Sequence, residues 1–388
     1  MKGFDPLNAQ VIADPYAAYA TLREDRPVHY SERLGSWVLT RYRDCHSVLS
    51  DVQVYASDWR RAGFEAPQAV MSMQELDPPE HSGLRRLFTT AFRGQRIDIL
   101  EKRATAQAAA LCESFIEAPS VNFTTEIAQP VALTAICDLL GVPEPPVRSF
   151  ADLSDALVLG MDAGLRPELL EPATAARKQV SEMIATWHAA GRLPGLLDEV
   201  LAGASAAGVT EDAVWASARV LFLAAFSTTV GAAANGVMAL LQNVGALERM
   251  RDPQLLDSGV DELMRFGGPV QGTTRAVVSP VEIDGIRIER GQLVLALIAA
   301  GNRDPEQFVT PDSLLLDRRP NRHLSLGWGP HACSGAMLAR SIMRALIVGL
   351  LGAPQSPRLA GTPSSTPRAT LHYPDDLPIT FTHRSEAP

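Results

Sequence analysis

Residues 323–340 read HLSLGWGPHACSGAMLAR, and this stretch decides how the rest of the chain is interpreted. Three glycines surround its cysteine: Gly327, Gly329 and Gly335. Glycines let a backbone loop approach another group closely and adopt conformations closed to other residues. Cys333 stands just before an apolar helical pattern over residues 336–350, where free N–H groups and the helix dipole lower the pKa of a thiol. The stretch therefore predicts that Cys333 is a thiolate ligand of a metal.

The remaining cysteines have no such surroundings. Cys45, Cys112 and Cys137 lie far apart in the sequence, outside any glycine-rich loop. The chain contains no CxxC pair, which argues against a disulfide framework, a zinc knuckle and covalent haem attachment. We expect these three residues to be inert cysteines of the core.

Composition limits the classes of protein that need to be considered. The 388 residues are 46% hydrophobic and 20% charged, enough to bury a large core. The net charge of -9 provides no global attraction to nucleic acid or to anionic membranes, so we expect neither as a partner. The N-terminus MKGFDPLNAQVIADP lacks an apolar signal segment, and no uncharged run is long enough to cross a bilayer. These features predict a soluble, cytoplasmic protein.

Helical patterns dominate between Pro79 and about Leu240. The longest candidate helix begins after Thr210, a suitable N-cap followed by two acidic residues, and runs to about Leu241. About thirty residues would span roughly 45 Å, enough to cross a domain. Its apolar middle predicts burial on most sides.

Short β-like segments occur near both ends of the chain. Val28–Tyr30 and Trp37–Thr40 read as strands joined by a turn at Gly35 and Ser36, and residues 281–288 alternate around the hairpin signal Asp284-Gly285. Residues 353–367 are expected to form a surface loop before a final strand pair. The pattern predicts a mainly α fold with small β-sheets, of the α+β kind.

Two further charged motifs lie upstream of the cysteine. Glu262 and Arg265 are three residues apart and share a helix face, a spacing that taken alone is typical of a solvated surface pair. His81 and Arg85 are four residues apart on an expected early helix, where an ordinary exposed face is the simpler interpretation.

Together these motifs resemble the cytochrome P450 superfamily in its soluble bacterial form. The cysteine loop has the family's order of aromatic residue, glycines, histidine, cysteine and glycine, and the HxxxR and ExxR motifs precede it as in the family. The resemblance runs from about Asp14 to Phe381 and implies a single P450 domain over residues 1–388. It implies haem b, held between the long central helix and the Cys333 loop.

The resemblance also assigns roles to residues around the haem. His81, Arg85, Arg275, His323 and His331 match positions that contact the propionates, for which the planar fork of arginine is suited. Gly327 and Gly335 belong to the cofactor-binding loop. Glu262 and Arg265 match the structural ExxR pair, with Arg318 or Arg319 as its third partner.

The chain departs from the family on the long helix. Residues 224–229 read AAFSTT, so Thr228 is in place while Ala225 replaces a glycine and Ser227 replaces the acid that helps to relay protons. Leu326 stands where the family usually has phenylalanine. We take Thr228 and Ser227 as the catalytic candidates, the second as a weaker proton donor than a carboxylic acid.

The implied activity is that of a haem-thiolate monooxygenase, which would hydroxylate, epoxidise or O-dealkylate a mostly apolar small molecule with O2. A ferredoxin and its reductase are the implied electron donors, and Arg86, Arg93, Arg340 and Arg344 are candidates for the docking patch. Radical coupling, desaturation and peroxide-driven oxidation remain alternatives because the acid is absent, and a haem-binding sensor without turnover is a further one. The positions matching the family's substrate pocket are Leu223, Phe226, Val230, Val270, Gln271, Leu377 and Ile379.

Overall fold

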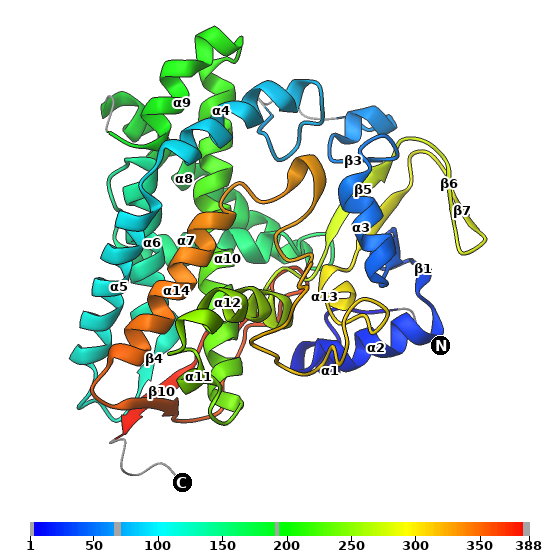
Figure 1. Ribbon diagram of the computed structural model, residues 1–388. Helices are drawn as coiled ribbons and strands as arrows, with labels where there is room; N and C mark the ends of the chain where they lie inside the picture. The colour runs from blue at the N-terminus through cyan, green and yellow to red at the C-terminus, as the bar shows by residue number, and fades with distance from the viewer. Residues whose placement is uncertain (1–3, 66–70, 191–193, 383–388) are drawn as a thin grey trace.

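The computed structural model describes residues 4–65, 71–190 and 194–382, and Figure 1 shows a large helical part beside a smaller part that holds most of the sheet. The helices are α1 (Ala9–Ala13), α2 (Pro15–Asp25), α3 (Tyr42–Ser50), α4 (Glu80–Gly94), α5 (Ile97–Ser114), α6 (Gln129–Leu140), α7 (Val147–Gly160), α8 (Leu170–Ala190), α9 (Leu196–Ala204), α10 (Glu211–Gln242), α11 (Ala246–Arg249), α12 (Pro253–Gly267), α13 (Ile298–Gly301) and α14 (Ala336–Gly352). The strands are β1 (Val28–Ser31), β2 (Ser36–Leu39), β3 (Tyr55–Ala56), β4 (Val121–Asn122), β5 (Thr273–Val277), β6 (Val281–Ile283), β7 (Ile286–Ile288), β8 (Leu293–Ala296), β9 (Ser356–Leu359) and β10 (Pro378–Thr382). The prediction of a mainly α fold with small sheets is confirmed.

Helix α10 runs through the helical part and organises its core (Figure 1). Thr210 caps it, its hydroxyl accepting a hydrogen bond from the Ala213 N–H at 3.3 Å, and Glu211 and Asp212 occupy the first turn. Among the described helices it is the one long and apolar enough to cross a membrane, yet 72% of its apolar window is buried inside the protein. Its apolar character is therefore that of a core helix, as the sequence predicts.

Helices α14 and α5 pack closely against each other beside this core. A Cβ atom on Gly349 of α14 would lie 2.6 Å from the Cβ of Ala108 on α5. Any larger residue at this position would push the helices apart, because core packing leaves no free space. This contact fixes the helix that follows Cys333 against the helical part.

The main sheet joins segments that are far apart in the sequence, in the order β1-β2-β8-β5-β3. Strands β1 and β2 pair antiparallel, and β2 pairs parallel with β8, Trp37 opposite Val294. The expected hairpin is present as β6 and β7, with positive φ values at Asp284 (52°) and Gly285 (74°). Primed two-residue turns require such values, so this prediction is confirmed in its geometry.

The prediction of a surface loop over residues 353–367 is wrong for part of the segment. Strand β9 lies within it and pairs antiparallel with β10. Strand β10 also pairs with β4, which gives a three-stranded sheet. The short run Ser356–Leu359 carries little β pattern of its own, so it becomes a strand through its partner.

Candidate functional site

The cysteine loop is held tightly by its own backbone. The Cys333 N–H donates to the Leu326 carbonyl at 2.7 Å. Gly329 has φ +68°, and a Cβ atom there would lie 2.9 Å from the Leu49 carbonyl oxygen of α3. Gly329 therefore meets two requirements at once, a left-handed backbone and a close approach to α3.

The other two glycines of the loop differ from each other. Gly327 has φ +66°, which favours glycine, whereas Gly335 has φ -87°. A Cβ atom on Gly335 would lie 4.0 Å from the Cys333 Sγ. Gly335 thus keeps space beside the sulfur, and Gly327 shapes the turn.

The pKa of the Cys333 thiol is not lowered, contrary to the prediction from the sequence. Burial raises the pKa of the Cys333 thiol, and a backbone hydrogen bond from Gly335 with the charges of Arg85 and Arg340 offsets the rise only in part. The residue nevertheless has exposed surface, unlike the three other cysteines, which are buried. The surrounding protein desolvates the thiol, yet the residue has free surface. Both observations are expected of a thiol that faces a space inside the protein.

Two of the predicted propionate contacts, His81 and His331, lie side by side. Next to them is Asp77, an acidic residue that the sequence reasoning missed. Their ring centroids are 4.6 Å apart, and His331 Nε2 lies 3.0 Å from Asp77 Oδ1. Burial opposes ionisation of Asp77, but hydrogen bonds from His331, the Asp58 backbone and Arg61 lower its pKa to about 2. Asp77 is therefore an anion at physiological pH that holds His331 in place.

Arg85 and Arg275 belong to the same cluster. Arg85 of α4 donates to the Ser334 hydroxyl and to the Ala332 carbonyl, which ties α4 to the cysteine loop. Arg275 of β5 donates to its own strand, at 2.9 Å to Thr273 Oγ1. Burial lowers the pKa of Arg275, and the negative charge of Asp77 opposes this shift in part. Arg275 therefore interacts electrostatically with the acid that holds His331.

His323 lies at the start of the loop and contacts different groups. Its Nε2 is 3.8 Å from Asp261 Oδ1, and its carbonyl accepts a hydrogen bond from the Trp328 indole N–H at 3.2 Å. Ring contact and electrostatic interactions group His81, Arg85, Arg275 and His331 around Asp77. Among the described residues, the contacts of His323 are with Asp261 and Trp328 instead.

Two ring nitrogens provide a test of whether these residues fit a haem. His81 Nε2 and His323 Nδ1 are buried, and neither has a hydrogen-bond partner among the described residues. Buried polar atoms without partners are costly, and a ring nitrogen that carries its proton there can donate to an acceptor on a ligand. Propionate oxygens are such acceptors, and the thiol of Cys333 is the ligand type that haem iron accepts. The residues fit the group.

The ExxR pair is not on the surface. Glu262 and Arg265 have side chains that are 0% exposed, and they form a double hydrogen bond with both N···O distances at 2.8 Å. Arg318 Nε also donates to Glu262 at 3.0 Å, whereas Arg319 is exposed. The structure therefore selects Arg318 as the third partner and excludes the interpretation of a solvated pair.

Neighbouring hydroxyls of α10 have different surroundings. Thr228 has partial exposure, and its hydroxyl donates to the Ala224 carbonyl at 2.5 Å. Ser227 is buried, with its Oγ 2.5 Å from the Ser154 Oγ of α7. Ala224, one turn before Thr228, is exposed. Accessible space therefore lies against the face of Ala224 and Thr228, and Ser227 points to α7.

Several predicted substrate contacts are buried in the core instead. Phe226 and Val230 are 2% exposed, and Leu377 and Ile379 are 0% exposed, because they pack between helices and sheet. These four side chains pack in the core, so their exposure lends no support to a substrate contact, and that assignment stays a prediction. Leu223 and Val270 keep partial exposure.

Gln271 is held by hydrogen bonds inside the protein. It is 4% exposed, its side-chain oxygen accepts from the Tyr19 hydroxyl at 3.0 Å, and its NH2 donates to the Pro269 carbonyl at 3.0 Å. Both ends of the amide are engaged inside the protein. The expected polar contact with substrate at this position is not supported.

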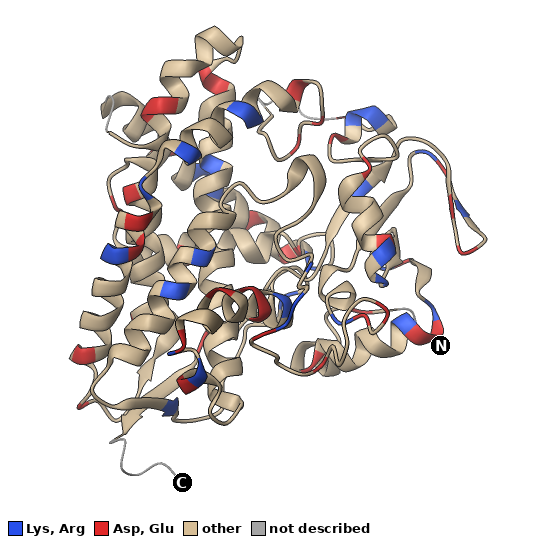
Figure 2. Cartoon of the chain, viewed as in Figure 1, with Lys and Arg blue, Asp and Glu red and all other residues tan. Residues whose placement is uncertain are grey.

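The proposed docking arginines divide into two kinds. Arg340 lies 2.7 Å from Asp261, and Arg344 pairs with Glu101, so both are committed to ion pairs within the protein. Arg86 and Arg93 on α4 are exposed and have no ion-pair partner in the described part of the chain. Figure 2 shows the two signs of charge interspersed over the helices. No extended basic face is evident in that view.

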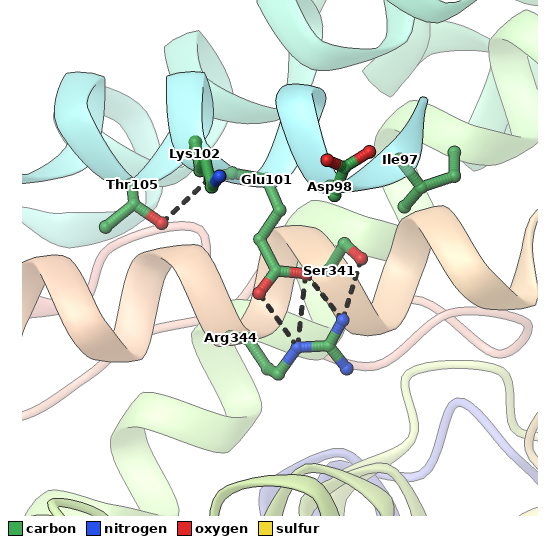
Figure 3. Close-up of a pocket in the computed structure, with 7 residues that line it drawn as sticks. All are labelled: Ile97, Asp98, Glu101, Lys102, Thr105, Ser341 and Arg344. Atoms are coloured by element: carbon green, nitrogen blue, oxygen red, sulfur yellow. Dashed lines mark hydrogen bonds and ion pairs between the residues drawn. The ribbon is translucent and has the colours of Figure 1, made fainter. Parts of the chain in front are cut away.

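A surface pocket lies between α5 and α14, away from the predicted site (Figure 3). The residues that line it are Ile97, Asp98, Glu101, Lys102, Thr105, Ser341 and Arg344. Figure 3 shows the Arg344 side chain turned to Glu101 and Ser341, to which it donates hydrogen bonds. None of the residues predicted to bind haem or substrate belongs to this pocket.

Asp77 and Ser154 are the site residues that sequence reasoning missed. Asp77 lies four residues before His81 in the sequence. Its nearness to a predicted haem contact could therefore have identified it as a site residue. Ser154 had none, because it contacts Ser227 only through the packing of α7 on α10.

Comparisons with known proteins identify similar chains. The family model described as Cytochrome P450 matches residues 242–353. Cytochrome P450 monooxygenase PikC of Streptomyces venezuelae is 32% identical over 358 residues, covering 89% of this chain and 85% of the relative. Nocardicin C N-oxygenase of Nocardia uniformis subsp. tsuyamanensis is 31% identical, with 97% of this chain and 98% of the relative covered. The crystal structure of CalO2 has a TM-score of 0.87 at 26% identity and covers 98% of this chain and 99% of that one.

Proposed function

The chain belongs to the cytochrome P450 superfamily and is an oxidoreductase of its monooxygenase type, and on that basis we propose that it is a haem-thiolate enzyme that oxidises a mostly apolar small molecule. The observation that carries the proposal is the loop of residues 323–340, with an exposed Cys333 thiol between glycines. We propose haem b as the cofactor and one catalytic domain over residues 1–388.

Cys333 would hold the iron, and His81, Arg85, Arg275, His323 and His331 would hold the propionates. A haem bound through a cysteine thiolate supplies dioxygen activation, because the thiolate pushes electron density onto the iron and favours O–O cleavage. The unpartnered nitrogens of His81 and His323 support their share in this binding. Asp77 fixes the orientation of His331.

The face of α10 that carries Ala224 and Thr228 would be the reaction face. Thr228 offers a hydroxyl on accessible space, and we propose that its Oγ1 would hold and pass a proton on this face of α10. Leu223 and Val270 remain as proposed substrate contacts, because both are apolar and partly exposed. Such a wall suits an apolar substrate.

A ferredoxin with its reductase is the proposed source of electrons, and a cytoplasmic location is proposed with it. Of the four arginines predicted for the docking patch, Arg86 and Arg93 of α4 are exposed and could bind an acidic electron donor. This assignment is tested by reversing both charges and measuring the rate of haem reduction by a surrogate ferredoxin at several salt concentrations.

A second candidate outcome is radical coupling, desaturation or peroxide-driven oxidation. Ser227 supports it, because a serine that is hydrogen-bonded to Ser154 is a poor substitute for a carboxylic acid. Turnover under isotopically labelled O2 separates the outcomes, since monooxygenation places labelled oxygen in the product and coupling or desaturation does not. A protein that binds haem and shows no turnover with any donor would instead favour the sensor.

The ligand assignment is tested by the carbon monoxide spectrum of the reduced protein. We expect the red-shifted band of a thiolate ligand in the wild type, and its loss in Cys333→Ala and Cys333→His. Cys112→Ala is the matched control, because that cysteine is buried on α5. A wild-type spectrum of the imidazole type would refute the proposal.

A further inference from the structure

A pair of serine hydroxyls lies inside an otherwise apolar interface between α7 and α10. Ser154 and Ser227 are 2% and 4% exposed, and their Oγ atoms are 2.5 Å apart. One turn earlier on α7, the ring of Phe150 lies 5.0 Å from the ring of Phe226, the residue before Ser227. The hydroxyl pair is therefore enclosed by apolar packing.

Apolar packing and the hydroxyl pair have different consequences for the interface. Contacts such as those of Phe150 tolerate small displacements, because they are not directional. A hydrogen bond requires a short distance and a defined angle, and a buried hydroxyl that loses its partner is costly. The pair consequently fixes how α7 is placed along α10.

The position of this pair matters because of its neighbours. Ser227 directly precedes Thr228, whose side chain lies on the accessible face of α10. One turn beyond Ser154, Val158 packs with Leu371 and Tyr373, and Val270 lies against the same cluster. A shift of α7 would therefore move the wall that includes Val270, a proposed substrate contact.

We propose that Ser154 is a positioning residue, which acts through Ser227 to fix α7 against α10 directly behind Thr228. Ser227 is then the anchor of this contact and not a proton donor. The inference rests on the proposed function in one respect, since it takes the Thr228 face of α10 as the reaction face. It assigns a role to the position where the family's acid is missing.

The contact itself is tested by a double-mutant cycle on Ser154→Ala, Ser227→Ala and the double variant, with urea unfolding as the measurement. Each single change should lower the folding equilibrium constant by about fivefold, and the double variant should lose no more than a single one. Ser114→Ala is the matched control, because its exposed hydroxyl bonds only the Leu111 carbonyl of its own helix. Additive losses, about 25-fold in the double variant, would overturn the tether.

The positioning role is tested on the haem-loaded protein with two iron-binding probes, imidazole and the bulkier 4-phenylimidazole. A displaced α7 should change the Kd of 4-phenylimidazole by about threefold or more, equally in both single variants and in the double one, and leave imidazole within about twofold. Unchanged 4-phenylimidazole binding in all three variants would overturn the positioning role.

A third readout distinguishes the anchor from a proton donor. We expect the ratio of released peroxide to product to shift by the same factor in Ser154→Ala and Ser227→Ala. A shift in Ser227→Ala alone would assign proton donation to Ser227 and overturn the inference. Failure of the proposed function would be recognised separately, because the reduced carbon monoxide complex would then lack the thiolate band. The double-mutant unfolding cycle does not depend on the haem.

Discussion

Glu262→Gln should destabilise the protein far more than the same change in a second pair of identical spacing. Glu262 is 0% exposed and accepts hydrogen bonds from Arg265 at 2.8 Å, from Arg318 at 3.0 Å and from the Leu315 N–H at 2.9 Å. The change removes the single carboxylate that faces two buried guanidinium groups. Breaking a buried pair in this way costs about 3–5 kcal/mol, which is a large part of a typical total of 5–15 kcal/mol.

The chain offers a matched control in Glu248 and Arg251. These residues are also three apart and lie 2.6 Å from each other, but their side chains are 54% and 41% exposed. An exposed pair contributes about 0–1 kcal/mol, so Glu248→Gln should have little effect. The two results would separate burial from sequence spacing.

The assay is urea unfolding followed by circular dichroism, with the free energy of unfolding taken by linear extrapolation. Arg318→Lys provides an intermediate variant, because it keeps the charge and loses the planar fork of donors. It should be less damaging than Glu262→Gln and remain measurable if that variant is insoluble. A loss for Glu262→Gln within about 1 kcal/mol of that for Glu248→Gln would refute the reasoning.

Three further outcomes are expected. Gly329→Ala should cost about 2 kcal/mol or more in urea unfolding, from its left-handed backbone and its approach to Leu49, whereas Gly35→Ala, with φ +59° and open space around it, should cost only about 1 kcal/mol; equal losses would contradict the close approach. In haem-free protein, burial and the neighbouring positive charges lower the pKa of His81 from 6.5 to about 4. The unfolded chain thus binds the extra proton, and the free energy of unfolding should fall by up to about 3 kcal/mol as pH drops from 6.5 to 4, a dependence that His81→Gln should flatten. Thr228→Ala should raise the ratio of released peroxide to product at least several-fold. The upper limit is the effect of losing a general acid, about 10²–10⁴-fold. An unchanged ratio would remove Thr228 from the proton path.

The sequence by itself was sufficient for the elements whose signals are local. Thr210 with its acidic neighbours marked the start of α10, and Asp284-Gly285 marked the β6–β7 turn, because caps and primed turns depend on residues adjacent in the chain. The loop around Cys333 was equally readable, since its glycines and its helix start lie within 18 residues. The family follows from these local motifs and from their order.

Only the tertiary structure decided which side chains meet across the chain. Glu262 pairs with Arg318 and not with the adjacent Arg319, because one side chain of the two turns inward. Strand β9 forms because β10 lies beside it, which no pattern in Ser356–Leu359 indicates. Gln271 and Leu377 proved to be internal, since burial depends on what packs above a residue.

The same limit applies to the centre of the site. The sequence showed that Ser227 replaces an acid, and it could not show that Ser154, 73 positions away, holds its hydroxyl. A hydrogen bond between two helices depends on their packing distance and rotation, which result from the whole core. The chemistry that is possible at Cys333 was fixed by local sequence, whereas the placement of the groups around Thr228 was fixed by the packing of α7 on α10.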